Sequence, residues 1–325
     1  MNAERPLVDL SELEFIGDGL LRPESVLIDA GGEIFVSDLE CGFAQIGRPR
    51  IPLKNRPEGF VPNGLAIGRQ GEFLIANPGG CGGVWKIDPE HVLHPFLLEH
   101  EGRELKNCNS VEVDELGRVW VSVSTRLSPR DLAFNAKAND GYVLLLDDKG
   151  ARIVADGIGF TNECRVDPSR SWLYVNETFA RRLTRFHIKE KNGSVELSDR
   201  ETVCEFDDGD FPDGLAFDAQ QGVWIACIIS NRVLRITADG KSRTILDDSD
   251  PDLIAWVEAR FGRGQLERSD IELGARRTLR NVSSIAFAGS DSKTVYLGTL
   301  GGSKIARFRS PIAGARSRPD RAALR

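Results

Sequence analysis

One hairpin pattern recurs six times along this 325-residue chain, and it constrains the fold more than any other feature. Each copy has a small or polar residue, a short apolar strand, a turn rich in Asp or Gly, and a second apolar strand. The β-branched and aromatic residues of the strands and the turn residues between them are typical of antiparallel hairpins. The six copies are Ser25–Asp38, Gly64–Asn77, Ser110–Val123, Glu163–Glu177, Gly214–Cys227 and Ser284–Thr299.

Further strands follow most copies, so that each repeat can supply a four-stranded sheet. The third strands are predicted at Gly83–Ile87, Tyr142–Leu146, Leu183–Ile188 and Val233–Ile236, and a fourth at Ser242–Leu246. Four-stranded antiparallel units repeated about every 40 to 50 residues are typical of propeller blades. The sequence therefore predicts an all-β fold, a six-bladed β-propeller. A large β-sandwich is the alternative, but it does not require six copies of one hairpin.

Two segments lie outside the repeat. The apolar stretch Glu12–Ile16 has no partner near it, and we expect it to be the outermost strand of the sixth blade, which closes the ring and removes exposed sheet edges. Before the last blade, Asp250 and Pro251 precede apolar residues at helical spacing (Leu253, Ile254, Trp256 and Val257), which predicts a short amphipathic helix. This insertion, residues 247–280, forms either a lid together with Leu127–Asn139 or a packing or dimer contact.

Bulk composition narrows the partners and the setting. The net charge of −7 and the lack of a basic cluster argue against nucleic acid, and no apolar run is long enough to span a membrane. The N-terminus has no secretory signal and the six cysteines form no C-x-x-C pair, so we expect a cytoplasmic protein with reduced thiols. We expect one domain over residues 1–325, with residues 310–325 as a solvated tail, and a monomer or homodimer.

The repeat register predicts a ring of oxygen-bearing side chains. The residues just before the first strand of each copy are Glu24, Asn63, Asn109, Asn162, Asp213 and Ser283. First strands line the channel of a propeller, so these side chains should meet at its axis. Carboxylates and amides placed together need a reason, since unpaired buried carboxylates repel one another. One divalent metal at this ring would supply it; oxygen ligands favour calcium, and magnesium, manganese, zinc and iron are the alternatives.

Four sequence segments resemble the family of gluconolactonase, regucalcin (senescence marker protein) and luciferin-regenerating enzyme. They are Pro23-Glu24, the stretch from Asn109 through Asp114 to Arg118, Phe160-Thr161-Asn162, and Pro212-Asp213-Gly214-Leu215. The resemblance spans roughly residues 20 to 310 and implies that Glu24, Asn109, Asn162 and Asp213 contact the metal. The chain departs from the family pattern at Asn107, where an arginine is common, and at Glu163, where a glycine is common.

The resulting functional hypothesis is a metal-dependent hydrolase of a small lactone. In it the metal polarises the substrate carbonyl, and Asp213 is both a ligand and the catalytic base that activates water. Alternatively Asp213 is a ligand only. We expect Asn63, Asn107, Arg126 and Glu163 to contact the substrate. The competing functions are an organophosphate or aryl-ester hydrolase at the same site, and a non-catalytic propeller that binds a small ligand.

Overall fold

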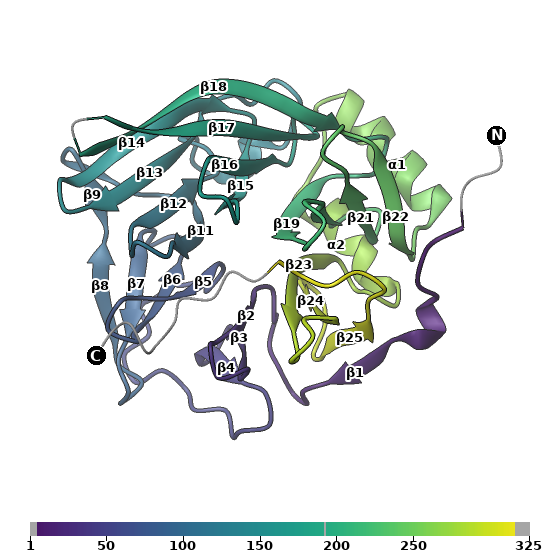
Figure 1. Cartoon of the computed structure of the whole chain (residues 1–325), viewed down its shortest axis with the longest axis horizontal. Helices are drawn as coiled ribbons and strands as arrows, with labels where there is room; N and C mark the ends of the chain where they lie inside the picture. The colour runs from purple at the N-terminus through teal and green to yellow at the C-terminus, as the bar shows by residue number, and fades with distance from the viewer. Residues whose placement is uncertain (1–4, 192, 316–325) are drawn as a thin grey trace.

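Six antiparallel sheets surround a central axis in the computed structural model, which describes residues 5–191 and 193–315 (Figure 1). Each of the six predicted hairpins forms the first two strands of one sheet. The prediction of a six-bladed β-propeller is thus confirmed. It follows from the repeated alternation of apolar strands and polar turns, which lets each sheet bury both faces against its neighbours.

The strands follow the chain order within each blade. The first three blades contain β2 (Val26–Ile28), β3 (Ile34–Asp38) and β4 (Gly42–Gln45); β5 (Leu65–Ile67), β6 (Phe73–Ala76), β7 (Val84–Ile87) and β8 (Leu93–Leu97); and β11 (Cys108–Val113), β12 (Val119–Val123), β13 (Gly141–Asp147) and β14 (Gly150–Ile158). A two-stranded ribbon, β9 (Glu99–His100) and β10 (Arg103–Glu104), connects the second blade to the third.

The other three blades are built in the same way. They contain β15 (Thr161–Val166), β16 (Trp172–Glu177), β17 (Arg182–Lys191) and β18 (Ser194–Glu205); β19 (Pro212–Phe217), β20 (Val223–Cys227), β21 (Arg232–Ile236) and β22 (Ser242–Asp247); and β23 (Val282–Ala288), β24 (Thr294–Thr299) and β25 (Ile305–Arg309) with β1 (Glu14–Ile16).

The ring closes through the N-terminal strand, as predicted. β1 pairs antiparallel with β25 as the outermost strand of the sixth blade, and Glu14 lies opposite Arg307, with which it forms an ion pair. Just upstream, the short 3-10 helix η1 (Leu10–Glu12) follows Val8, whose backbone N–H donates to the carbonyl of Ile245 on the fifth blade. The N-terminal segment therefore joins two blades as well as completing one.

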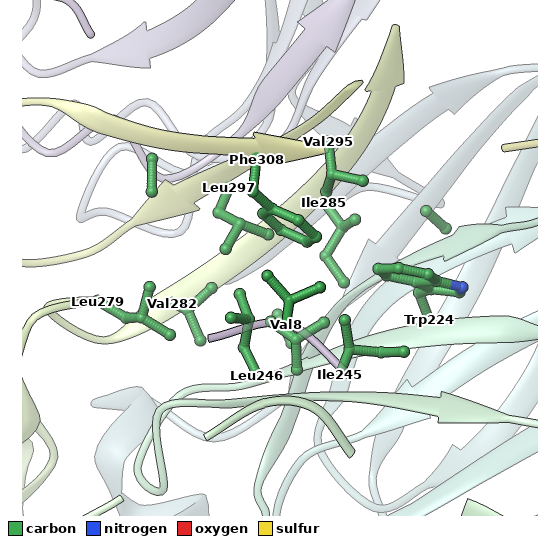
Figure 2. Close-up of a cluster of buried hydrophobic side chains, with 14 residues drawn as sticks. Val8, Trp224, Ile245, Leu246, Leu279, Val282, Ile285, Val295, Leu297 and Phe308 are labelled. Carbon is green, nitrogen blue, oxygen red and sulfur yellow. The ribbon is translucent and has the colours of Figure 1, made fainter. Parts of the chain in front are cut away.

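The core consists of apolar layers between neighbouring blades. Between the fifth and sixth blades, the buried side chains include Val8 and the fully buried Trp224 (Figure 2). The indole N–H of Trp224 donates to the hairpin-turn residue Asp218 at 2.9 Å, and Trp120 donates to the equivalent Asp114 at 3.0 Å. These aspartates also accept backbone N–H groups of their own turns. Each carboxylate therefore connects its hairpin turn to a buried tryptophan of the core.

The helical insertion before the last blade is confirmed. It contains α1 (Pro251–Gly262), α2 (Arg268–Glu272) and the 3-10 helix η3 (Leu273–Arg276). Asp250 caps α1 by accepting from the backbone N–H groups of Asp252 and Leu253, as its sequence predicted. The buried face of α1 carries Val257 and Phe261, whereas Trp256 is 53% exposed and does not belong to that face.

The C-terminal stretch differs in part from the solvated tail that we predicted. Residues 310–315 return to the turns of the fifth and sixth blades: Ser310 is buried, Gly314 donates its N–H to the carbonyl of Ser292, and Ala315 donates to that of Phe217. The physical reason is that backbone hydrogen bonds to these turns compensate for the lost solvation. Residues 316–325 lie outside the described part of the chain.

The two ends of the central channel differ. A cavity of about 1010 Å³ opens at the hairpin-turn end, between small and apolar residues such as Ala66 and Ala216. Its charged lining includes the buried Asp114 and the half-buried Glu112 and Arg165. The predicted oxygen ring lies at the other end, where the first strands begin. No helix among residues 5–191 and 193–315 has the length and apolar character needed to cross a bilayer.

Candidate functional site at the channel mouth

The six predicted ring residues meet at one end of the channel, and all six are buried. Neighbours in the ring are linked: the Ser283 hydroxyl donates to the Glu24 carbonyl at 2.8 Å, and the Asn63 amide donates to the side-chain oxygen of Asn109 at 2.5 Å. The Asn162 amide hydrogen-bonds the Asp213 carboxylate. The repeat register therefore correctly predicted which side chains lie together.

Two glycines let the first strands come this close. A Cβ at Gly64 would lie 2.5 Å from the Cα of Ser110, and one at Gly214 would lie 2.3 Å from the carbonyl oxygen of Ser283. Each glycine directly follows a ring residue, Asn63 or Asp213, so the requirement for close backbone approach coincides with the site.

The two central amides have fixed orientations. The Asn109 amide nitrogen donates to the Ser124 hydroxyl at 3.1 Å, and the Asn162 amide nitrogen donates to the Thr178 hydroxyl at 2.9 Å. Ser124 and Thr178 both directly follow the second strands of their blades. Because the hydroxyls hold the nitrogens, the amide oxygens face the ring with acceptor capacity for a cation; the Asn109 oxygen also accepts from Asn63 and would use its second lone pair.

The two carboxylates of the ring, Glu24 and Asp213, lie in surroundings that disfavour their ionised forms. Burial raises the pKa of Asp213 well above its usual range, and the nearby charges of Glu24 and Glu163 raise it further. Burial also raises the pKa of Glu24, although Arg22, Arg130 and Arg268 oppose that shift. Two buried carboxylates that repel each other, beside two oriented amides, form a donor set that fits a hard divalent cation.

Oxygen is the only donor type that the ring offers. No group of three or more His, Cys, Asp and Glu side chains gathers anywhere in the described part of the chain, so a cation bound here would need the amides of Asn109 and Asn162 as well as the carboxylates. Glu24, Asn109, Asn162 and Asp213 are the residues that would hold it. Such a set suits calcium or magnesium better than zinc.

The backbone before the ring is strained in a repeated way. Arg22, Asn107, Phe160 and Asn281 each lie two residues before a ring residue, and each has a left-handed φ between 56° and 64°. This conformation costs a non-glycine residue free energy and occurs at sites that the surrounding structure over-determines.

Buried polar side chains support these strained turns. They come from the end of the second strand or the loop after it, and they accept backbone N–H groups of the turns. At three of the strained turns the pairs are Leu21 to Asp38 at 2.9 Å, Gly159 to Glu177 at 2.6 Å and Asn281 to Asn231 at 2.7 Å. The turn before Asn63, which has no left-handed residue, has the equivalent pair Val61 to Asn77 at 2.9 Å. The ring positions are thus set by side chains outside the ring.

Two predicted substrate contacts, the ring residue Asn63 and Glu163 next to the ring residue Asn162, have their polar groups engaged inside the protein. The Asn63 amide lies between Arg22, which donates to its oxygen at 2.9 Å, and Asn109. The Glu163 carboxylate accepts the backbone N–H of Leu215 at 2.7 Å and pairs with Arg165. Glu163 thus bridges two blades, as Ser284 does when its hydroxyl accepts the N–H of Val26.

The other two predicted substrate contacts support a loop. Asn107 donates to the carbonyls of Thr125 at 3.0 Å and Leu127 at 2.8 Å. These bonds fix the start of the insertion Leu127–Asn139. Arg126 makes two hydrogen bonds of 2.8 Å to Asp156 and stacks on Tyr142. The guanidinium of Arg126 is therefore paired away from the ring.

Three arginines that the sequence did not single out lie near the ring instead. Arg22 precedes β2, Arg130 begins the 3-10 helix η2 (Arg130–Ala133), and Arg268 begins α2. All three act electrostatically on Glu24. Only Arg22 carried a usable signal, because it stands two residues before a predicted ligand. The other two reach the site from long insertions whose placement the repeat does not define.

The two insertions meet over the ring end of the channel. α1 and the η2 segment share one apolar cluster with Phe160, Phe179 and Phe211 of the blades. Phe134 of the η2 segment stacks near Phe179 at 4.7 Å between ring centroids. The insertions therefore form an apolar cover beside the ring and bring Arg130 and Arg268 to it.

The cysteines near the ring are not suited to nucleophilic chemistry. Cys108 and Cys164 are fully buried, and burial raises the pKa of the Cys108 thiol to about 12. A thiol with so high a pKa stays protonated at neutral pH.

Comparisons with known proteins agree with this architecture. Residues 50–247 match the family model described as the SMP-30/gluconolactonase/LRE-like region. The 6-deoxy-6-sulfogluconolactonase of Pseudomonas putida is 28% identical over 237 residues, 72% of this chain and 67% of that protein. Pentonolactonase XacC of Haloferax volcanii is 27% identical over 268 residues, 82% of this chain and 76% of that protein.

A solved structure shares the fold over almost the whole chain. The calcium-binding protein regucalcin from Agrobacterium tumefaciens superposes with a TM-score of 0.61 and 16% identity, covering 94% of this chain and 97% of that one. The family model covers well over half of the chain and includes three of the four candidate ligands. The chain therefore belongs to the SMP-30/gluconolactonase/LRE-like family of six-bladed β-propellers.

Proposed function

We propose that this protein is a lactone hydrolase that works with one divalent metal ion, calcium, held by Glu24, Asn109, Asn162 and Asp213. The observation that carries the proposal is the convergence of two buried carboxylates and two oriented amides on the channel axis. Relatives named as sugar lactonases support a lactone substrate.

When bound, the metal would supply positive charge that polarises the lactone carbonyl and stabilises the tetrahedral oxyanion. The chain itself supplies a base. Asp213 takes a proton from water, whose oxygen adds to the carbonyl carbon. The ring C–O bond then breaks, the proton passes to the departing ring oxygen, and a hydroxy acid is released.

Glu24 acts as a ligand and not as a base. Arg22 lies beside it, with a closest distance of 3.5 Å between the guanidinium and the carboxylate, and this cation favours the ionised form. The same arginine donates to the carbonyl of Pro62 and to the side-chain oxygen of Asn63. It therefore connects the Glu24 ligand to the second blade.

The test is a lactone panel assayed with purified protein, with and without a chelator, beside metal analysis of the same sample. We expect acid release that the chelator abolishes and that added calcium restores. Release of a phenol or fluoride from aryl esters or organophosphates without lactone turnover would instead assign the ester-hydrolase function. A retained metal without any turnover would assign a ligand-binding propeller.

Asp213→Asn separates the base from the ligand. We expect this variant to bind calcium and to lose at least about a hundredfold in kcat, the usual contribution of a positioned base. Loss of the metal together with activity would instead leave Asp213 as a ligand only.

A further inference from the structure

Arg130 is a half-buried cation that forms no ion pair with the described residues. Its Nε atom is buried and has no hydrogen-bond partner among the described residues, and its Nη2 atom donates to the Ser124 hydroxyl over a long distance of 3.3 Å. Its guanidinium lies 5.1 Å from the centroid of the Phe160 ring. A partly buried charge that lacks both an ion pair and a full set of hydrogen bonds is unfavourable in the folded protein.

The surroundings increase that cost. Burial lowers the pKa of Arg130 to about 10, and the like charges of Arg268 and Arg22 lower it further, while Glu24 and Asp213 oppose the shift. Three guanidinium groups from three different segments therefore lie within electrostatic reach of one another at the ring.

The other arginines nearby are paired. Arg268 contacts Glu272 at 3.1 Å along α2, and Arg126 is held by Asp156. Arg22 bonds to the carbonyl of Pro62 and to Asn63. Arg130 is thus the cation at the ring whose Nε–H has no acceptor among the described residues.

The balance of charges at the ring also points to Arg130; this step rests on the proposed function. Glu24 and Asp213 would together balance one divalent cation. Arg130 and Arg22 would then have no carboxylate left to offset them. A substrate that brings its own negative charge would satisfy this excess, because the guanidinium fork matches carboxylate, phosphate and sulfonate oxygens.

We infer that Arg130, assisted by Arg22 and Arg268, forms an anion subsite, and that the lactone hydrolysed here carries a carboxylate, phosphate or sulfonate group remote from its carbonyl. The inference explains why a long insertion places Arg130 over the phenyl ring of Phe160, beside the candidate ligands. It also gives the two insertions, η2 with its loop and α2, a shared role in substrate selection.

The experiment compares pairs of ligands that differ in one charged group. Calorimetry on the metal-loaded protein measures the binding of gluconate and 6-phosphogluconate, and kinetics measures kcat/KM for their lactones. Carboxylate-bearing and sulfonate-bearing lactones identify which anion is preferred. In the wild type we expect the member of a pair with the additional anionic group to bind at least about tenfold more tightly, and Arg130→Gln to reduce that ratio below about threefold, consistent with one charge-assisted contact.

Arg263→Gln is the matched control. It removes the same charge from an exposed residue at the end of α1, so it tests for long-range charge alone. We expect it to retain the wild-type ratio. Equal binding of gluconate and 6-phosphogluconate, or a ratio that Arg130→Gln leaves unchanged, would overturn the inference.

Two further results separate this inference from the proposed function. If neither lactone is turned over but the charged acid still binds more tightly through Arg130, the hydrolase proposal fails and the subsite stands. If the neutral lactone is hydrolysed as well as the charged one, the subsite fails and the hydrolase stands.

Thermal unfolding excludes a merely structural role: Arg130→Gln should not lower the Tm, because it breaks no ion pair, and a fall of several degrees would contradict the subsite.

Discussion

The side-chain amide of Asn162 donates to the hydroxyl of Thr178 at 2.9 Å, and that hydroxyl in turn donates to the carbonyl of Pro212 at 2.8 Å. Thr178 lies just past the end of the second strand of the fourth blade, while Pro212 precedes Asp213 at the start of the fifth. One hydroxyl therefore orients a candidate ligand and links it to the blade that carries the next one.

Thr178→Val should weaken calcium binding without unfolding the protein. Valine keeps the shape but removes both hydrogen bonds, so the Asn162 amide loses its orientation. Loss of such a supporting contact typically lowers metal affinity about 10- to 100-fold. Competition with a fluorescent chelator measures the change, and Thr202→Val at an exposed strand position is the control. Unchanged affinity would show that Thr178 does not position the ligand.

Gly214→Ala should destabilise the fold by about 1–3 kcal/mol, the usual cost of forcing an extra methyl group into a packed site. The new Cβ would lie 2.3 Å from the Ser283 carbonyl oxygen and 2.7 Å from the Ser284 Cα, and backbone atoms cannot move aside easily. Urea denaturation measures the difference. Gly80→Ala, where a Cβ meets nothing within 4 Å, should have little effect; equal stability of both variants would contradict the close approach.

Val8→Ala should cost about 2 kcal/mol of unfolding free energy, because two buried methyl groups leave the layer between the fifth and sixth blades. Its neighbour Leu7 is 39% exposed, so Leu7→Ala should cost much less. Thermal unfolding of the two variants tests whether the N-terminal segment is part of the core. A Val8 variant as stable as the wild type would show that ring closure does not depend on this contact.

Glu177 should make stability depend on acid pH. Burial alone would raise the pKa of its carboxyl, but hydrogen bonds from Arg182, Thr184 and the N–H of Gly159 outweigh burial and lower it. A carboxyl with a depressed pKa in the folded state stabilises the fold above its unfolded value, near 4.5, and this contribution is lost as the pH falls through the folded pKa.

The matching variant is Glu177→Gln. At pH 7 it should lose about 3 kcal/mol, because Arg182 and Arg200 lose the buried partner that they share. The difference from the wild type should shrink below about pH 4. Urea denaturation at several pH values measures it, with the exposed Glu196→Gln as the control. A penalty that stays constant with pH would exclude an electrostatic origin.

Much of the candidate site was predictable because it follows the repeat. Glu24, Asn109, Asn162 and Asp213 occupy one position of a recurring hairpin, and equivalent positions in a propeller converge on the axis. The repeat gives no such guide to contacts outside it. Asn107 donates to the carbonyls of Thr125 and Leu127, and Arg126 donates to Asp156, partners that the sequence did not indicate.

The sequence by itself determined the six blades, the strand that closes them and the set of oxygen-bearing residues at the axis, because strand alternation and turn residues act locally and repeat in register. Only the tertiary structure decided which polar groups are already bonded and which remain unused. Asn63 and Glu163 are satisfied by residues 46 and 52 positions away, whereas the Nε–H of Arg130 has no acceptor among the described residues. The reason is that hydrogen-bond satisfaction depends on how long insertions pack against distant blades, and no local pattern encodes that packing.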